Sequence, residues 1–197
     1  MKILAFTDVH SDKAVLKGIV RKSKNTDILL CSGDLSFFGN GLDESIKILL
    51  KAKKKILIIH GNHETEEQIS RLGKRYSSVI GIHKRPTSFD GFVFVGYGGD
   101  GFSIRDENLE RYFDKLKNRL SMGKRLITVT HAPPRNTKLD YIPGFGHVGN
   151  MSINKAIMRL KPVLHICGHI HECFGRRDKI GRTILVNPSY DGRILNI

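Results

Sequence analysis

The first 74 residues alternate short apolar runs with amphipathic stretches, and this alternation restricts the fold more than any other feature of the sequence. The apolar runs, which are typical of buried strands, are Lys2–Thr7, Asp27–Cys31 and Lys55–His60. The stretches with helical spacing are Lys13–Lys24, Leu42–Ala52 and a polar segment that reaches about Lys74. A β-α-β-α-β-α order of this kind predicts a layered α/β fold that begins with a mostly parallel sheet.

The rest of the chain contains shorter strands and two more helices. We expect strands at Val79–His83, Arg85–Phe89, Phe92–Tyr97, Arg125–Thr130 and Val163–Cys167, and helices at Glu107–Leu120 and Ile153–Leu160. Residues Thr137–Asn150 include four Gly or Pro residues and are expected to form a loop, and loops of this length in compact domains are usually functional. The C-terminal end is expected to form a hairpin and edge strands. We find no linker, so we expect one domain over residues 1–197.

The composition is that of an ordinary folded protein with an excess of positive charge. The chain has 40% hydrophobic residues, and its 33 Lys and Arg against 19 Asp and Glu give a formal net charge of +14. This composition excludes a disordered class, while the charge favours an anionic partner without choosing among phosphorylated small molecules, nucleic acid and a membrane surface. Three cysteines are too few for a disulfide framework, and an odd number cannot all pair. No apolar run approaches the roughly 18 residues of a membrane helix. The N-terminal apolar stretch is too short for a secretory signal. We therefore expect a cytoplasmic protein without a membrane segment.

Polar side chains follow five of the expected strands at the point where each strand ends. They are Asp8 and His10, Asp34, Asn62 and His63, His131, and His169 and His171. In α/β sheets the carboxyl ends of the strands form the edge where ligands bind, so we expect these side chains to meet. The mixture of carboxylate, amide and imidazole suits Mn, Fe, Zn, Co or Ni better than a thiolate zinc site or an all-oxygen calcium site.

With their neighbours, these residues form five sequence blocks in a fixed order. The blocks are Asp8-Val9-His10, Gly33-Asp34, Gly61-Asn62-His63-Glu64, His131 and Gly168-His169-Ile170-His171. In this order they resemble the signature of the calcineurin-like metallophosphoesterases, and the segments around His131 and Asn187 are similar to those of small prokaryotic members. The resemblance implies an α/β fold made of a two-sheet β-sandwich flanked by helices. It also implies a metal-dependent phosphoric ester hydrolase.

The resemblance further implies a role for each site residue. One metal would be held by Asp8, His10, Asp34 and His171, and a second metal by Asp34, Asn62, His131 and His169. Asp34 would bridge the two divalent ions, and a hydroxide between them would attack phosphorus in line. His63 would be catalytic, by stabilising the phosphoryl charge or protonating the leaving alkoxide. Glu64 would orient His63 without binding metal itself.

Several other polar residues carry weaker predictions. His147, in the glycine-containing loop, is our candidate for a substrate contact, and Asn187 is a weaker candidate. His165 is expected in the core or behind the ligands, His60 in a structural role, and His83 at the surface.

The sequence favours a phosphodiesterase over a phosphomonoesterase, with a phosphorylated small molecule as substrate. The net charge of +14 keeps a nuclease that acts on DNA or RNA as an alternative. A non-catalytic scaffold is less favoured, because the ligand set and His63 are intact. The sequence leaves the bound metals and the oligomeric state open.

Overall fold

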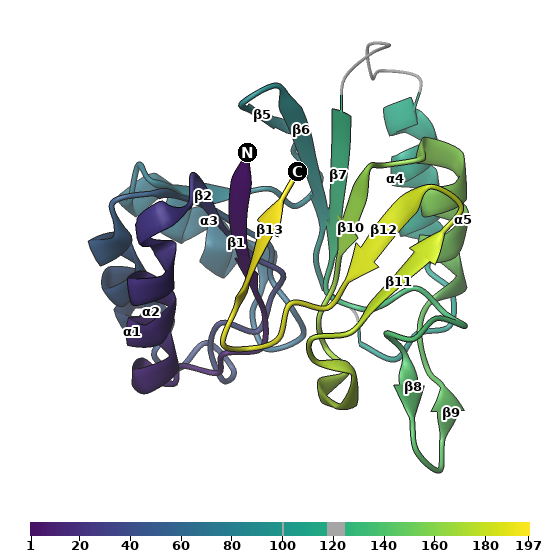
Figure 1. Cartoon of the computed structure of the whole chain (residues 1–197), viewed down its shortest axis with the longest axis horizontal. Coiled ribbons are helices and arrows are strands. Elements are labelled where there is room, and N and C mark those ends of the chain that lie inside the picture. Colours follow the sequence, from purple (N-terminus) through teal and green to yellow (C-terminus); the bar gives the residue numbers. More distant parts are fainter. Residues whose placement is uncertain (100, 118–124) are drawn as a thin grey trace.

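A computed structural model describes residues 1–99, 101–117 and 125–197 of the chain. Two main β-sheets stand face to face, and helices cover the outer side of each sheet (Figure 1). A small hairpin of β8 (Tyr141–Ile142) and β9 (Gly146–His147) extends from this body. The arrangement confirms the two-sheet α/β sandwich flanked by helices that the family resemblance implied.

The first sheet contains five strands in the order β13-β1-β2-β3-β4. Strands β1 to β4 run parallel to one another, and β13 runs antiparallel to β1 at one edge. The bounds are Lys2–Phe6 (β1), Ile28–Cys31 (β2), Lys55–Ile58 (β3), Val79–Gly81 (β4) and Arg193–Asn196 (β13). The expected parallel sheet is therefore present, and its four parallel strands are slightly shorter than the apolar runs that predicted them.

The second sheet contains six strands in the order β11-β12-β10-β7-β6-β5. Its four central strands are parallel, and β5 and β11 run antiparallel at the two edges. The bounds are Thr87–Phe89 (β5), Phe92–Tyr97 (β6), Arg125–Thr130 (β7), Leu164–Ile166 (β10), Arg177–Ile180 (β11) and Thr183–Val186 (β12). The expected C-terminal hairpin is the β11–β12 pair.

In the described part of the chain, five helices cover the sheets on the side away from the opposite sheet (Figure 1). They are α1 (Lys13–Lys22), α2 (Leu42–Leu49), α3 (Glu66–Arg75), α4 (Glu107–Lys117) and α5 (Met151–Leu160), and 3₁₀ turns lie at Ser23–Asn25, Leu50–Ala52 and His171–Cys173. The helix expected at Glu107–Leu120 is described as far as Lys117, and residues 118–120 lie outside the described part of the chain. None of the described helices combines the length and the apolar character that crossing a membrane requires.

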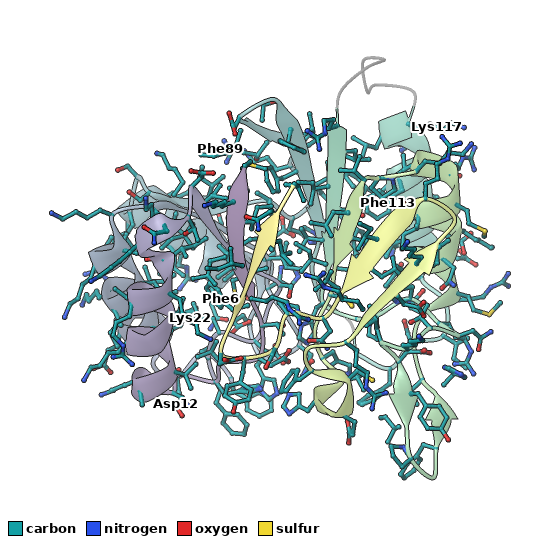
Figure 2. All side chains as sticks on the ribbon, in the orientation of Figure 1. Phe6, Asp12, Lys22, Phe89, Phe113 and Lys117 are labelled. Atoms are coloured by element: carbon teal, nitrogen blue, oxygen red, sulfur yellow. The ribbon has the colours of Figure 1, made fainter. Side chains whose placement is uncertain are left out.

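The core consists of three apolar layers because the central strands are buried on both faces. In β1, Ile3 and Ala5 pack between the two sheets, whereas Leu4 and Phe6 pack against the helices of the first sheet. Phe113 of α4 belongs to the third layer, outside the second sheet (Figure 2). Strands buried on both faces have nearly continuous apolar sequences, and such continuity is what the sequence of β1 to β3 displays.

The prediction that His83 lies at the surface is wrong. Only 8% of its side chain is exposed, and its ring lies between those of His60 and Tyr97, with centroids 4.6 and 5.2 Å away. The amide of Gly98 donates a hydrogen bond to His83 Nδ1 at 2.8 Å, and burial lowers the pKa of His83 to about 4. The polar neighbours of His83 in the sequence concealed this burial.

His165 lies in the core, as expected, and is held by two threonines. Its Nδ1 lies 2.9 Å from Thr128 Oγ1 and its Nε2 lies 3.2 Å from Thr130 Oγ1. The Thr130 hydroxyl donates to the carbonyl of Ala132, so it accepts a hydrogen bond from His165 Nε2–H, and Nδ1 accepts one from Thr128. This pattern uses the neutral ring, and burial lowers the pKa of His165 to about 3.

The neutral state of His165 makes stability depend on pH. In the unfolded chain an ordinary histidine binds a proton below about pH 6.5, whereas the folded ring stays neutral down to about pH 3. The unfolded state therefore binds more protons between these values, and the free energy of unfolding falls as the pH is lowered through this range. We expect His165→Gln to reduce that slope by up to about 1.4 kcal/mol per pH unit, measured by denaturant unfolding with EDTA present. Equal slopes in the two proteins would contradict the assignment.

Candidate metal centre

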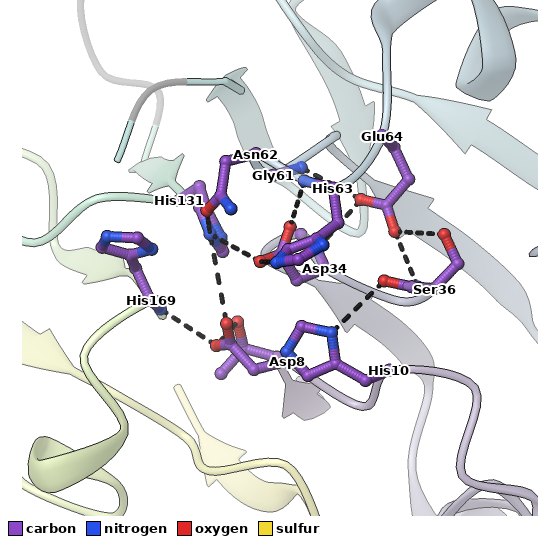
Figure 3. A network of polar contacts seen from close by, with 12 residues as sticks. Asp8, His10, Asp34, Ser36, Gly61, Asn62, His63, Glu64, His131 and His169 are labelled. Atoms are coloured by element: carbon purple, nitrogen blue, oxygen red, sulfur yellow. Dashed lines mark hydrogen bonds and ion pairs between the residues drawn. The ribbon is translucent and has the colours of Figure 1, made fainter. Parts of the chain in front are cut away.

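The residues at the strand ends come together in one site. Asp8 and His10 follow β1, Asp34 follows β2, and Asn62 and His63 follow β3. From the second sheet, His131 follows β7, and His169 and His171 follow β10. Figure 3 shows the site with residues from both sheets side by side. The polar side chains therefore lie together at the carboxyl ends of the strands, as the sequence predicted.

The loops that carry these side chains have unusual backbone conformations. Asp8, His10, Asp34 and His169 have φ angles of 50°, 48°, 51° and 69°, in the left-handed region that residues other than Gly rarely adopt. The first two loops are also bonded together, since the amides of Asp8 and His10 donate to the carbonyls of Gly33 and Asp34 at 3.0 and 3.1 Å. Such strain persists only where surrounding contacts enforce it, and it is concentrated at functional sites.

One group of side chains surrounds His131, which is fully buried. His131 Nδ1–H donates to the carbonyl of Ser32 at 3.0 Å, so Nε2 is the nitrogen that faces the site. Asn62 Oδ1 lies 2.9 Å and Asp34 Oδ2 lies 3.2 Å from this Nε2. Burial opposes a charge on the ring, but the hydrogen bond to Asp34 and the charges of Asp8 and Asp34 outweigh it and raise the pKa of His131 to about 9. The carboxylate oxygens of Asp8 and Asp34 therefore favour a positive charge at this position.

A second group surrounds Asp8. His171 Nε2 lies 3.5 Å from Asp8 Oδ1, and His10 Nδ1–H donates to the carbonyl of Ser36 at 3.3 Å, which leaves His10 Nε2 for the site. Burial raises the pKa of Asp8, but the nearby His171 ring and the charge of His131 outweigh it and hold that pKa at about 2. Asp8 is therefore a charged ligand candidate at neutral pH.

The side chains of the site fit a pair of divalent metal ions. One nitrogen or oxygen from each of Asp8, His10 and His171 lies within 4.8 Å of the others, and the same holds for Asp34, His131 and His169. In the described part of the chain, Asp8 Oδ1 and His169 Nε2 are buried without a hydrogen-bond partner. A buried polar atom without a partner is costly, so these two atoms indicate that a cation belongs there.

His63 lies against both groups. Its Nε2 is 3.8 Å from Asp34 Oδ2, its amide donates to Asp34 Oδ1 at 2.9 Å, and its ring centroid is 4.9 Å from that of His10. His10, Asp34 and His63 also offer ligand atoms within 4.8 Å of one another. Distance alone therefore does not separate His63 from a metal ligand, and its separate role rests on the family resemblance.

Glu64 contacts different partners from those expected. Its Oε1 accepts hydrogen bonds from the amide and hydroxyl of Ser36 at 2.6 and 2.8 Å, and its Oε2 accepts from the amides of Asp34 and Gly61 at 3.0 and 3.2 Å (Figure 3). Three of these bonds come from Asp34 and Ser36 and one from the amide of Gly61, and none of them involves the His63 ring. The prediction that Glu64 orients His63 is therefore wrong for the ring itself: Glu64 fixes the loop of Asp34, the proposed bridging residue, and ties it to Gly61.

The two substrate candidates do not join the ligand groups in the described structure. His147 lies in the β8–β9 hairpin, where its Nδ1 is 2.8 Å from Asp140 Oδ1. Asn187 is fully buried, with its Nδ2 donating to the carbonyl of Ile170 at 3.3 Å and its Oδ1 accepting from the amide of Ser189. A side chain without exposed surface does not fit a substrate contact, so Asn187 instead supports the loop of His169 and His171.

Sequence reasoning missed two aromatic residues of the site, Phe37 and Phe38. The Phe37 ring stacks on the His63 ring with centroids 5.0 Å apart and planes at 27°, and the Phe38 ring meets it edge-on at 4.3 Å. The only sequence signal is a pair of aromatic residues in the loop between Asp34 and a glycine-rich turn.

Comparison with known proteins decides the family. The sequence profile described as calcineurin-like phosphoesterase matches residues 1–173. The chain belongs to the calcineurin-like phosphoesterase family. The resemblance carried by the five sequence blocks is thereby confirmed, and with it a metal-dependent phosphoester hydrolase whose family uses a dinuclear divalent metal centre.

Individual relatives cover nearly the whole chain of this phosphoesterase. Uncharacterized protein MJ1162 of Methanocaldococcus jannaschii is 36% identical over 201 residues, which span 96% of this chain and 88% of that protein. The crystal structure of TT1561 of Thermus thermophilus superposes with a TM-score of 0.78 at 16% identity, over 96% of this chain and 89% of that chain. The crystal structure of a dimetal phosphatase from Danio rerio superposes with a TM-score of 0.65 at 13% identity, over 94% of this chain and 86% of that chain. The two structures are similar to this chain in fold.

Metal binding should stabilise the phosphoesterase through Asp34. Adding Mn²⁺ to EDTA-treated protein should raise the melting temperature, since a ligand at a hundred times its Kd adds about 2.7 kcal/mol per site. Asp34→Asn should lose most of this rise. Asp191→Asn changes an exposed carboxylate that pairs with Lys22 and belongs to none of the ligand groups, and it should keep the rise. Equal rises in the wild type and Asp34→Asn would contradict the assignment.

Glu64 should increase the affinity for metal by holding the backbone of the loop that carries Asp34. Glu64→Gln turns an NH₂ group toward one of the amide donors and leaves a buried donor unpaired, which we expect to cost about 1–3 kcal/mol of stability. Residues that support metal ligands typically contribute 10- to 100-fold to affinity, so Mn²⁺ titration should show a loss of that size. Unchanged affinity in a folded Glu64→Gln protein would contradict this role.

Proposed function

We propose that this protein is a phosphodiesterase that holds two divalent metal ions, with water as the attacking group. Asp8, His10, Asp34 and His171 would bind one ion, and Asp34, Asn62, His131 and His169 would bind the other. The observation that supports this most is the convergence of the ligand groups, since Asp34 belongs both to the group of His131 and His169 and to a group with His10. His10 in turn belongs to the group of Asp8. The donor atoms thus form one continuous set with Asp34 between the ends.

The chemistry follows from these residues. When bound, two divalent cations supply Lewis acidity, which polarises the phosphoryl group and makes water nucleophilic near neutral pH. The ring of His63 lies beside Asp34 and is 15% exposed, so it can reach a bound phosphoryl group. We assign His63 to the leaving side, where it donates a proton to the departing oxygen or stabilises the phosphoryl charge.

The charges of the site favour a diester over a monoester. In the described part of the chain, the ion-pair partners of Asp8 and Asp34 are all histidines, and no Lys or Arg side chain joins them. A monoester dianion is usually bound with the help of cationic side chains, and Arg in particular suits it. We therefore take a phosphodiester, with one negative charge, as the better match for a site whose two carboxylates pair only with histidines in the described residues. The metals would be chosen from Mn, Fe, Zn, Co and Ni, with manganese tested first.

A nuclease with the same chemistry is the second candidate, because the net charge of +14 favours a polyanion. It is tested with single- and double-stranded DNA and RNA oligonucleotides. A nuclease should cleave at least one of them and should lose affinity steeply as salt is added. A protein that hydrolyses small diesters but leaves all four oligonucleotides intact is not a nuclease.

Activity on two chromogenic substrates tests the proposed function. With Mn²⁺, Ni²⁺ or Co²⁺ the wild type should hydrolyse bis-p-nitrophenyl phosphate faster than p-nitrophenyl phosphate, and EDTA should abolish both activities. His63→Ala should lower kcat by about 10²–10⁴-fold while the protein still binds two equivalents of metal. Inactivity of the wild type with every metal, or full activity in Asp34→Asn, would falsify the proposal.

A further inference from the structure

The rim of the metal centre carries a pair of exposed aromatic rings. Phe37 and Phe38 are 54% and 66% exposed, although burial of a phenylalanine is normally favourable. Both rings lie on the same residue, His63, with centroids 5.0 and 4.3 Å from its ring. The two rings also contact each other edge-on at 4.9 Å. We call this pair the Phe37–Phe38 wall.

The wall is held firmly by polar contacts at its base. On one side, Ser36 donates two hydrogen bonds to the buried carboxylate of Glu64. On the other side, the Ser11 hydroxyl donates to the carbonyl of Asn40 at 2.8 Å, and the Asn40 amide donates to the carbonyl of Phe37 at 3.0 Å. Phe38 also has a left-handed φ of 51°, a conformation that is costly for a bulky residue. The loop is therefore fixed while its two rings stay exposed.

The position of the Phe37–Phe38 wall beside His63 determines which part of a bound substrate would contact its rings. A phosphoryl group bound at the ligand groups would lie beside His63, which we assign to the leaving oxygen. The substituent on that oxygen then extends toward the rings that contact His63. Aromatic rings hold planar rings by offset or edge contacts, and bases stack on exposed aromatic side chains in many nucleotide-binding sites.

We propose that the Phe37–Phe38 wall selects phosphodiesters whose leaving group carries a planar ring, and that this ring is a nucleobase. This inference rests on the proposed phosphodiesterase function and adds its substrate class. It also fixes which ester bond breaks. Water supplies the new oxygen on phosphorus, the bond from phosphorus to the nucleoside oxygen breaks, and that oxygen leaves with a proton as the free nucleoside alcohol.

Two further rings near the site, those of Phe102 and Phe174, lie on metal ligands and not on His63. Phe102 meets the His169 ring edge-on at 4.5 Å, and Phe174 stacks on the His171 ring at 4.7 Å. Both come from the second sheet's side of the site, so they would border the retained part of the substrate. The contact with His63 is what assigns the leaving side to Phe37 and Phe38.

The test uses two diesters that differ only in the base: adenosine 5′-(methyl phosphate) and the ribose 5-(methyl phosphate) that lacks adenine. With Mn²⁺-loaded wild type, kcat/KM for the adenine diester should be roughly 10- to 100-fold higher, as base stacking on an aromatic ring predicts. Chromatography should detect adenosine and methyl phosphate as the main products, and not AMP and methanol.

Two variants complete the test. The double variant Phe37→Leu/Phe38→Leu keeps apolar side chains but removes the planar rings, and it should bring the ratio of the two kcat/KM values close to one. Phe145→Leu is the matched control, since Phe145 is 83% exposed between β8 and β9, and it should leave the ratio unchanged.

The inference fails if the wild type does not distinguish the two diesters, or if it releases AMP. It also fails if the double variant slows both diesters equally, because the rings would then only position His63. A loss of the ratio in Phe102→Leu but not in the double variant would move the base to the other side of the site and overturn the assignment. If the wild type cleaves neither diester nor bis-p-nitrophenyl phosphate with any metal, the proposed function itself fails.

Discussion

The structure depends on two buried carboxylates, Asp8 and Asp34, that the fold holds in one site. Both are almost fully buried, and the charge of each disfavours the charge of the other. Two such groups stay ionised inside a protein only where positive charge compensates them. Without bound metal, a protonated His131 supplies part of that charge, and the partnerless atoms Asp8 Oδ1 and His169 Nε2 mark where metal cations would supply the rest. The polar contacts of the site are organised around this demand for cations.

The sandwich architecture is what allows one site to collect ligands from the whole chain. The first sheet contributes Asp8, His10, Asp34 and Asn62. The second sheet contributes the ligands His131, His169 and His171. Contacts behind the ligands then fix their loops, as when Glu64 binds the amides of Asp34 and Gly61. The same carboxylate anchors Ser36, so a single buried group links the metal ligand Asp34 to the loop that carries the exposed aromatic rings.

Local sequence patterns predicted the parallel strands and placed all seven ligand candidates at their carboxyl ends, because apolar periodicity and strand ends are local properties. The facing of the two sheets came only from the family resemblance, since the apolar layer between them joins residues far apart in the sequence, such as Ile3 and Val186. The burial of His83, the partners of Glu64 and the burial of Asn187 depend on tertiary packing, which periodicity does not encode. Phe37 and Phe38 escaped notice for the same reason: only the folded loop brings them onto His63.

The location of bound metal is the most direct test of the dinuclear centre. Crystals grown with Mn²⁺ and measured at the manganese absorption edge would give anomalous density at each ion. We predict two peaks about 3.5–4 Å apart, one next to Asp8 and His171, the other next to His131 and His169, with Asp34 contacting both. A single peak, or two peaks of which Asp34 contacts only one, would contradict the dinuclear centre on which the proposed chemistry depends.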